Sequence, residues 1–174
     1  MTKRAPGKFA RRVRDFYPTP RAAVVPLLPH IHESDVIYEP CAGAGDLVRA
    51  LRSFGFAVPL YSDILDGIDA AALSPADLAL STVFITNPPW SRDVLHPIIT
   101  NLSDLLPTWL LLDADWSHTV QAAPFAVRCR KIVSVGRLRW IPDSPHTGLD
   151  NCAWYLFDKP AHTDTRYVWR LSNA

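Results

Sequence analysis

The tightest constraint on how this chain folds is a short apolar run that ends in two consecutive prolines. Residues 83–86, Val-Phe-Ile-Thr, are apolar and β-branched, which predicts a buried strand. Asn87-Pro88-Pro89-Trp90 follows, and proline fixes φ and lacks an N–H, so the strand has to stop there. The stiff strand end carries an amide, an indole and nearby carbonyls, which could hold an amino group on a planar ring. Asn-Pro and Pro-Pro are also common in ordinary turns.

A strand, a small-residue turn and a helix are predicted earlier in the chain. Residues 35–38 form the expected strand, the turn is Glu39-Pro40-Cys41-Ala42-Gly43-Ala44-Gly45-Asp46, and residues 47–54 form the helix. This arrangement opens a βα nucleotide-binding unit, in which glycine lets a ligand approach the backbone. Only Gly43-x-Gly45 of the full glycine fingerprint is present, so a purely structural turn is the alternative. A second strand at 58–62 ends in Asp63, close to the spacing at which such folds place an acid on a ribose.

The remaining elements predict an α/β fold with a mostly parallel sheet and an antiparallel terminal strand. Thr19 is the expected N-cap of a first helix, and residues 70–81 are expected to hold a short helix. Further elements are expected at 92–105 (a helix disturbed by Pro97), 109–113 (strand), 117–128 (a helix interrupted by Pro124), 131–141 (a strand bent at Gly136), 153–157 (strand) and 166–171 (edge strand or tail). With no linker or repeat evident, residues 15–174 are expected to be one domain.

Charge is unevenly distributed along the 174 residues. Residues 15–174 carry 12 basic and 17 acidic residues, a net charge of −5. Residues 1–14, the basic arm, contain no acid and six bases, which are Lys3, Arg4, Lys8, Arg11, Arg12 and Arg14. Such an arm is either a solvated tail or a nucleic-acid-binding segment.

Three widely separated cysteines, without metal-ligand spacing, predict a reduced, cytoplasmic protein with neither a disulfide framework nor a metal site. The chain lacks an apolar run long enough for a membrane span, and its N-terminus has no secretory h-region.

The glycine turn, Asp63 and the Asn-Pro-Pro-Trp tetrapeptide stand in a familiar order. The chain resembles the class I S-adenosylmethionine-dependent methyltransferases, most closely the DNA adenine-N6 methyltransferases, whose signature includes E-P-x-x-G-x-G and [DNS]-P-P-[YFW]. Residues 15–20, Asp-Phe-Tyr-Pro-Thr-Pro, look like the family's aromatic-x-Thr-Pro segment. These motifs span residues 15–90, and residues 136–155 are more loosely similar to the family's closing strands. The resemblance implies a three-layer Rossmann-like methyltransferase fold, S-adenosylmethionine as cofactor, and double-stranded DNA with an adenine target as partner.

The resemblance also implies roles for matched positions. Asp63 would accept hydrogen bonds from the ribose hydroxyls, with Ile64 against the adenine ring. Asp69 would face the adenine amino group or is a solvated loop residue. The cofactor-binding residues implied are Tyr17, Thr19, Pro20, Glu39, Pro40, Cys41, Ala42, Gly43, Gly45, Asp63, Ile64, Asp69 and Asn87.

The implied catalytic residues are Asn87, Pro88, Pro89 and Trp90. The target adenine would be flipped out of the stack, and its amino group would donate to the Asn87 side-chain oxygen and the Pro88 carbonyl. Trp90 would stack on the flipped base, although tyrosine and phenylalanine are more usual at its position.

Sequence-specific members of the family usually carry a target-recognition domain, and 174 residues leave no room for one. The basic arm and the loops at 91–96 and 142–151 would then read the DNA, or specificity is low, or a homodimer or specificity partner supplies it. The same tetrapeptide also serves RNA adenine-N6 and protein glutamine methyltransferases. A catalytically silent module that binds cofactor or DNA is the alternative from another functional class.

Overall fold

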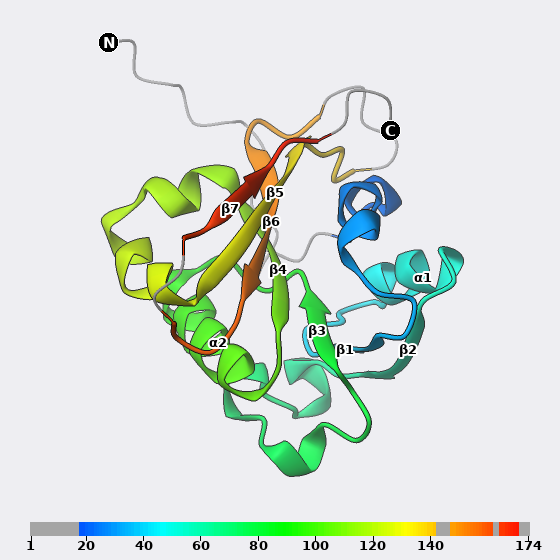
Figure 1. Ribbon diagram of the computed structural model, residues 1–174. Coiled ribbons are helices and arrows are strands. Elements are labelled where there is room, and N and C mark those ends of the chain that lie inside the picture. Colours follow the sequence, from blue (N-terminus) through cyan, green and yellow to red (C-terminus); the bar gives the residue numbers. More distant parts are fainter. Residues whose placement is uncertain (1–17, 142–146, 162–163, 171–174) are drawn as a thin grey trace, which may run out of the picture.

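A seven-stranded mixed sheet forms the centre of the computed structural model, which describes residues 18–141, 147–161 and 164–170 (Figure 1). Tyr17 and the basic arm lie outside the described residues. The strand order is β2-β1-β3-β4-β6-β5-β7. The strands are β1 (Val36–Glu39), β2 (Ala57–Tyr61), β3 (Val83–Thr86), β4 (Thr108–Asp113), β5 (Cys129–Arg137), β6 (Asn151–Phe157) and β7 (Arg166–Val168).

The predicted mostly parallel sheet with one antiparallel strand is confirmed. Only β6 runs against its neighbours, and although it is late in the chain, it lies between β4 and β5 rather than at the sheet edge. The other six strands share one direction. Their carboxyl ends therefore lie along one edge of the sheet. We call it the catalytic edge, because the residues implied as catalytic by the sequence resemblance follow β3 there. In open α/β sheets this is the edge at which ligands bind.

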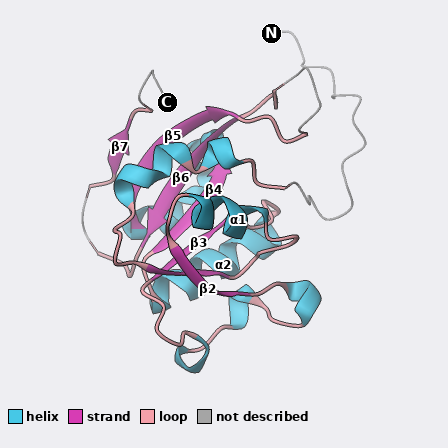
Figure 2. Cartoon of the chain, turned by 90° about the vertical axis from the view of Figure 1, so that its right-hand side faces the viewer, coloured by secondary structure: helices cyan, strands magenta, loops and turns pink. Residues whose placement is uncertain are grey.

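Helices cover both faces of the sheet, which makes three layers (Figure 2). The α-helices are α1 (Asp46–Ser53) and α2 (Arg92–Leu105). The remaining helical segments are the 3₁₀ helices η2 (Arg21–Ala23), η3 (Val25–His30), η4 (Ile64–Asp66), η5 (Ala70–Ala72), η6 (Pro75–Asp77), η7 (Ala114–His118) and η8 (Val120–Arg128).

Alternating side chains divide the core into two clusters, because successive residues of a strand point to opposite faces. Ile85 and Trp154 face α1, η2 and η3, whereas Phe84 and Tyr155 face α2. The indole N–H of Trp154 donates to the backbone oxygen of Ala23 over 2.7 Å, which ties η2 to the sheet. Strands buried on both faces explain the continuous apolar runs in the sequence.

Several helix predictions are wrong in detail. Thr19 does not cap a helix, since η2 begins after Pro20 without a side-chain cap, and the prolines of η3 limit this region to 3₁₀ turns. The expected helix over 70–81 is two separate turns, and Asp69 and Ser74 stand at their N-caps. Residues 117–128 also form 3₁₀ turns around Pro124.

Pro97, by contrast, does not break α2, which continues from Arg92 to Leu105. Pro97 and Asp93 both lie on the exposed side of the helix. Water can therefore bond the carbonyl that loses its intrahelical partner. The predicted bend at Gly136 is confirmed by a left-handed φ of 88° and a register shift between β5 and β6.

Within the described residues, no helix has the length and apolarity to cross a membrane. The same residues contain no group of three histidine, cysteine, aspartate or glutamate side chains that could hold a metal ion.

Candidate cofactor cavity and catalytic tip

A cavity of about 690 Å³ opens at the catalytic edge, between the loops that follow β1, β2 and β3. This volume is in the range of small-molecule and cofactor sites. The sequence-predicted residues that line it are Thr19, Glu39, Pro40, Cys41, Ala42, Gly43, Asp63, Ile64, Asp69, Asn87, Pro88 and Pro89. Motifs that lie far apart in the sequence therefore line one cavity.

The glycine turn leads from β1 into α1 and forms one wall of the cavity. Gly43 and Gly45 have φ values of 51° and 78°, a left-handed conformation that side chains disfavour. The Gly45 N–H donates to the Ala42 carbonyl over 2.7 Å, and the Ala42 N–H donates to the Ser62 carbonyl over 2.9 Å. The turn is thus closed on itself and attached to the end of β2.

Asp63 joins the glycine turn to the loop after β2. Its Oδ2 accepts from the Gly43 N–H over 2.8 Å, and its Oδ1 accepts from the Leu65 N–H over 3.0 Å. A carboxylate has more lone pairs than these two bonds use, so Asp63 can also accept from a ligand hydroxyl. Ile64 and Leu65, the exposed apolar residues that follow, line the cavity beside it.

Glu39 is a buried acid at the end of β1 and is 1% exposed. Its Oε1 accepts from the Thr86 hydroxyl over 2.7 Å, whereas Oε2 is buried without a hydrogen-bond partner in the described structure. Burial raises the pKa of Glu39 well above its usual value, and the Thr86 hydroxyl and the Asn87 N–H offset this only in part. Burial likewise raises the pKa of the Cys41 thiol, which is therefore protonated at neutral pH.

We expect Glu39→Gln to remove a pH dependence of stability in the cofactor-free protein. A raised pKa means that the folded state keeps a proton that the unfolded state loses. The unfolding free energy of the wild type should therefore fall by up to about 1.4 kcal/mol per pH unit between the unfolded and the folded pKa. Urea unfolding of both proteins, followed by tryptophan fluorescence above pH 5, measures the difference. Parallel stability curves would contradict the prediction.

Asn87, Pro88 and Pro89 of the tetrapeptide after β3 form the opposite wall. We call the tetrapeptide the catalytic tip, after the role that the sequence resemblance implies for it. The Asn87 side-chain nitrogen donates to the Thr19 hydroxyl over 3.1 Å, which leaves the amide oxygen available as an acceptor. Pro88 and Pro89 line the cavity. Two segments that are far apart in sequence therefore fix the orientation of the Asn87 amide.

Trp90 does not line the large cavity. Its indole N–H donates to the Leu111 carbonyl over 2.9 Å, and its ring packs edge-on against Trp140 at a centroid distance of 6.0 Å. The ring is thus held between the end of β4 and the segment after β5. Pro20 lines a neighbouring hollow instead of the cavity, and Gly45 shapes the turn through its left-handed φ.

Sequence reasoning missed several residues of the site. The Thr86 hydroxyl donates to Glu39, and the Trp140 ring packs against Trp90. No sequence motif points to Thr86 or Trp140. Thr86 could have been found as the last residue of β3, beside the end of β1. The remaining unpredicted lining residues are Pro18, Ala44, Asp46, Leu47, Leu65, Ala70, Ser91, Val94 and Ile98.

The residues present fit S-adenosylmethionine. The unpartnered Oε2 of Glu39 lies in a residue that lines the cavity, where a ligand cation such as an amino-acid ammonium would compensate it. Asp63 can accept from ribose hydroxyls, and Ile64 and Leu65 offer apolar surface to a flat base.

Comparisons with known proteins agree with this fold. No protein-family model matches the sequence, and no curated protein matches it either. Among solved structures, the type IIG restriction endonuclease BpuSI is similar over 84% of this chain, with 14% identity and a TM-score of 0.58. A modification subunit of a proposed type I restriction enzyme from Vibrio vulnificus YJ016 is similar over 88% of this chain, with 11% identity and a TM-score of 0.50.

The chain corresponds to only a part of each of these proteins, 26% of the BpuSI chain and 47% of the Vibrio subunit. The similarity therefore concerns the fold. Within this chain, that fold combines the strand order, the antiparallel β6 and the glycine turn between β1 and α1. The chain has a three-layer, Rossmann-like α/β fold, which it shares with parts of the BpuSI and Vibrio proteins.

Proposed function

We propose that this protein transfers a methyl group from S-adenosylmethionine to the N6 amino group of adenine in DNA. The observation that carries the proposal is the position of Asn87 and Pro88 in the wall of the cavity that also contains the glycine turn and Asp63. An acceptor for an amino group thus lies within one cavity with residues suited to the cofactor. The two similar structures are a restriction endonuclease and a modification subunit of a restriction enzyme, which supports DNA as the substrate.

S-adenosylmethionine, when bound, supplies an electrophilic methyl group. The glycine turn and Glu39 would hold its amino-acid part, and Asp63 would hold its ribose. The Asn87 side-chain oxygen and the Pro88 carbonyl would accept both hydrogens of the adenine amino group. These bonds draw the nitrogen lone pair out of the ring and aim it at the methyl carbon, so that positioning and electrostatics supply most of the rate.

The Thr19 hydroxyl has a supporting role in this arrangement. By accepting from the Asn87 nitrogen, it keeps the amide oxygen directed away from itself and available to the substrate. A strong general base is not required, because the amino group can lose its proton after the methyl group is attached. Trp90, which is held by Leu111 and Trp140, would stack on the flipped base through a free face of its ring.

The direct test incubates the protein with tritiated S-adenosylmethionine and, separately, double-stranded DNA, RNA and a protein lysate. We expect label in DNA, recovered after hydrolysis as N6-methyladenine. Label only in RNA would favour an RNA adenine methyltransferase, and label only in protein would favour a glutamine methyltransferase. Cofactor binding by calorimetry without transfer to any acceptor would favour a silent module.

We also expect that removal of residues 1–14 weakens DNA binding and flattens its salt dependence. The segment carries six bases and no acid, and each phosphate contact that it makes adds about 0.9 to the slope of log affinity against log salt. Fluorescence anisotropy with a labelled duplex over a salt series measures the slope. An unchanged slope would assign these residues to a solvated tail.

A further inference from the structure

A second hollow, of about 330 Å³, lies next to the cofactor cavity and shares Pro18, Thr19 and Asp46 with it. We call it the arginine hollow. Because the Thr19 hydroxyl accepts from Asn87, a single residue separates the arginine hollow from the catalytic tip. Its other lining residues come from η2, α1 and the segment after β5, and they are Pro20, Arg21, Arg49, Ala50, Ser53, Arg139 and Trp140.

The arginine hollow has a positive charge balance. Three guanidinium groups meet there with a single carboxylate, Asp46, which pairs with Arg49 over 2.6 Å. The formal charge of its lining is therefore +2, within a portion of the chain, residues 15–174, whose net charge is −5. An anion is therefore attracted to the arginine hollow.

Arg21 and Arg49 are held in place by neighbouring side chains, whereas Arg139 forms no ion pair with any residue that the structure describes. Arg21 stacks over the Phe54 ring at 3.8 Å and donates to the Ser53 hydroxyl over 3.1 Å. Arg139 is exposed, and no carboxylate in the described part of the chain lies within ion-pair distance of it. The guanidinium fork of an unpaired arginine matches the paired oxygens of a phosphate.

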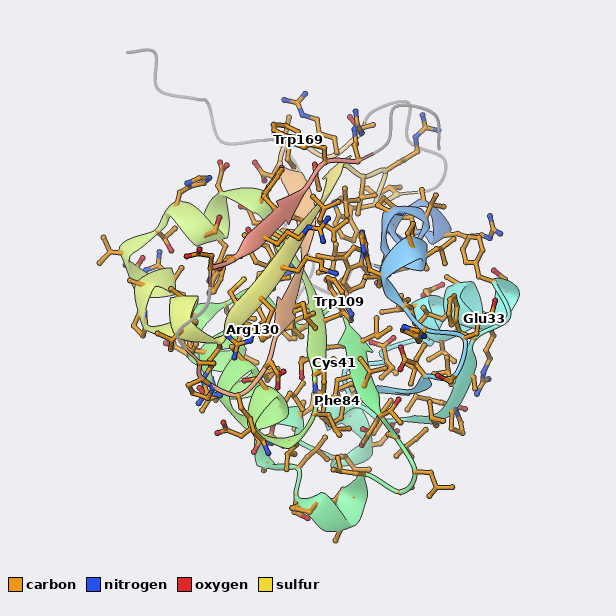
Figure 3. All side chains as sticks on the ribbon, in the orientation of Figure 1. Glu33, Cys41, Phe84, Trp109, Arg130 and Trp169 are labelled. Carbon is orange, nitrogen blue, oxygen red and sulfur yellow. The ribbon has the colours of Figure 1, made fainter. Side chains whose placement is uncertain are left out.

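The fold explains why these residues meet beside the catalytic tip. Arg139 and Trp140 follow β5 where its carboxyl end reaches the catalytic edge, the same edge at which Asn87 follows β3. Trp169, which is 78% exposed, follows β7 at this edge (Figure 3), and its ring packs edge-on against that of Tyr167. Cationic and aromatic side chains of this kind are those that contact the backbone and bases of nucleic acids.

We propose that the arginine hollow binds a backbone phosphate of the DNA strand that carries the target adenine, close to the flipped nucleotide. This inference rests on the proposed function, and it assigns a contact with the DNA backbone to residues that the structure describes. A base that rotates out of the duplex turns about its own backbone, so the neighbouring phosphate has to be held while the base enters the cavity. Arg139 makes the new contact, and Arg21 and Arg49 supply the fixed positive wall.

The test compares Arg139→Gln, Arg139→Lys and a matched control, Arg166→Gln. Arg166 is also exposed, but it stands at the start of β7. Its backbone lies opposite Lys131 near the start of β5, so it is away from the catalytic edge. Fluorescence anisotropy with a short labelled duplex over a salt series measures the slope of log affinity against log salt. Arg139→Gln should lower the magnitude of this slope by about 0.9 and weaken binding several-fold. Arg139→Lys should keep the slope, and Arg166→Gln should leave slope and affinity unchanged.

Kinetics add a readout that a loss of folding would not mimic. Arg139→Gln should raise the KM for DNA while kcat and the calorimetric affinity for S-adenosylmethionine remain at wild-type values. If the wild type methylates DNA and the Arg139→Gln variant has the same salt slope and the same KM, the phosphate site is overturned and the proposed function stands. A wild type that neither binds nor methylates DNA would instead overturn the proposed function. Weaker binding to RNA but not to DNA would also overturn the inference.

Discussion

Asn87→Ala is expected to lower kcat for DNA methylation by at least about 10²-fold, the scale on which a single electrostatic partner of a reacting group acts. The substitution removes the side-chain oxygen that would accept from the adenine amino group, and the adjacent Pro88 carbonyl cannot hold both hydrogens. Cofactor affinity should change little, because the glycine turn, Glu39 and Asp63 remain. Single-turnover methylation with tritiated S-adenosylmethionine and calorimetry of cofactor binding measure the two effects.

Asn87→Asp is the matched variant, because it keeps an oxygen acceptor of the same length, replaces the nitrogen that donates to Thr19 by a second oxygen and adds a negative charge. Its activity should lie above that of Asn87→Ala. Equal loss in both variants would mean that the reaction requires the neutral amide, whose nitrogen donates to Thr19, rather than an acceptor oxygen alone. A large loss of cofactor affinity in Asn87→Ala would mean that the catalytic tip mainly supports the shape of the cavity.

The strands and the order of the motifs could be predicted from the sequence because both depend on local chemistry. The apolar run at 83–86 coincides with β3, and the helix at 92–105 coincides with α2. Glycine and proline fix the backbone where β1 and β3 end, and parallel strands then bring those ends together. This is why residues chosen from separate motifs line a single cavity.

The rest depends on tertiary contacts that the sequence pattern does not contain. Thr19 has the composition of an N-cap, but its hydroxyl accepts from Asn87 instead, 68 residues away. The ring of Trp90 is directed by the Leu111 carbonyl and by Trp140, which lies beyond the fifth strand. The single pairing of Glu39 with Thr86 follows from two neighbouring strand ends, and only the strand order shows that β1 and β3 are neighbours.

Asp63→Ala is expected to weaken the binding of S-adenosylmethionine by about 10²-fold, since a hydrogen bond to a charged group contributes roughly 1.5–3 kcal/mol. The loss has two physical sources. The carboxylate would no longer accept from the ribose, and the glycine turn would lose the 2.8 Å bond between the Gly43 N–H and Asp63 Oδ2. Titration calorimetry of the purified protein measures the affinity, and activity at saturating cofactor should recover toward the wild-type value.

Asp66→Ala is the appropriate control, because Asp66 lies in the same turn, is exposed and does not line the cavity. It removes an equal charge and should leave cofactor affinity unchanged. Asp63→Asn separates the two sources of the loss, since an amide oxygen can still accept from the Gly43 N–H while the charge is gone. An intermediate affinity for Asp63→Asn would show that both the held turn and the carboxylate contribute. If Asp63→Ala and Asp66→Ala bind S-adenosylmethionine equally well, Asp63 is not part of the cofactor site. Neither its carboxylate nor its bond to the Gly43 N–H would then affect cofactor binding.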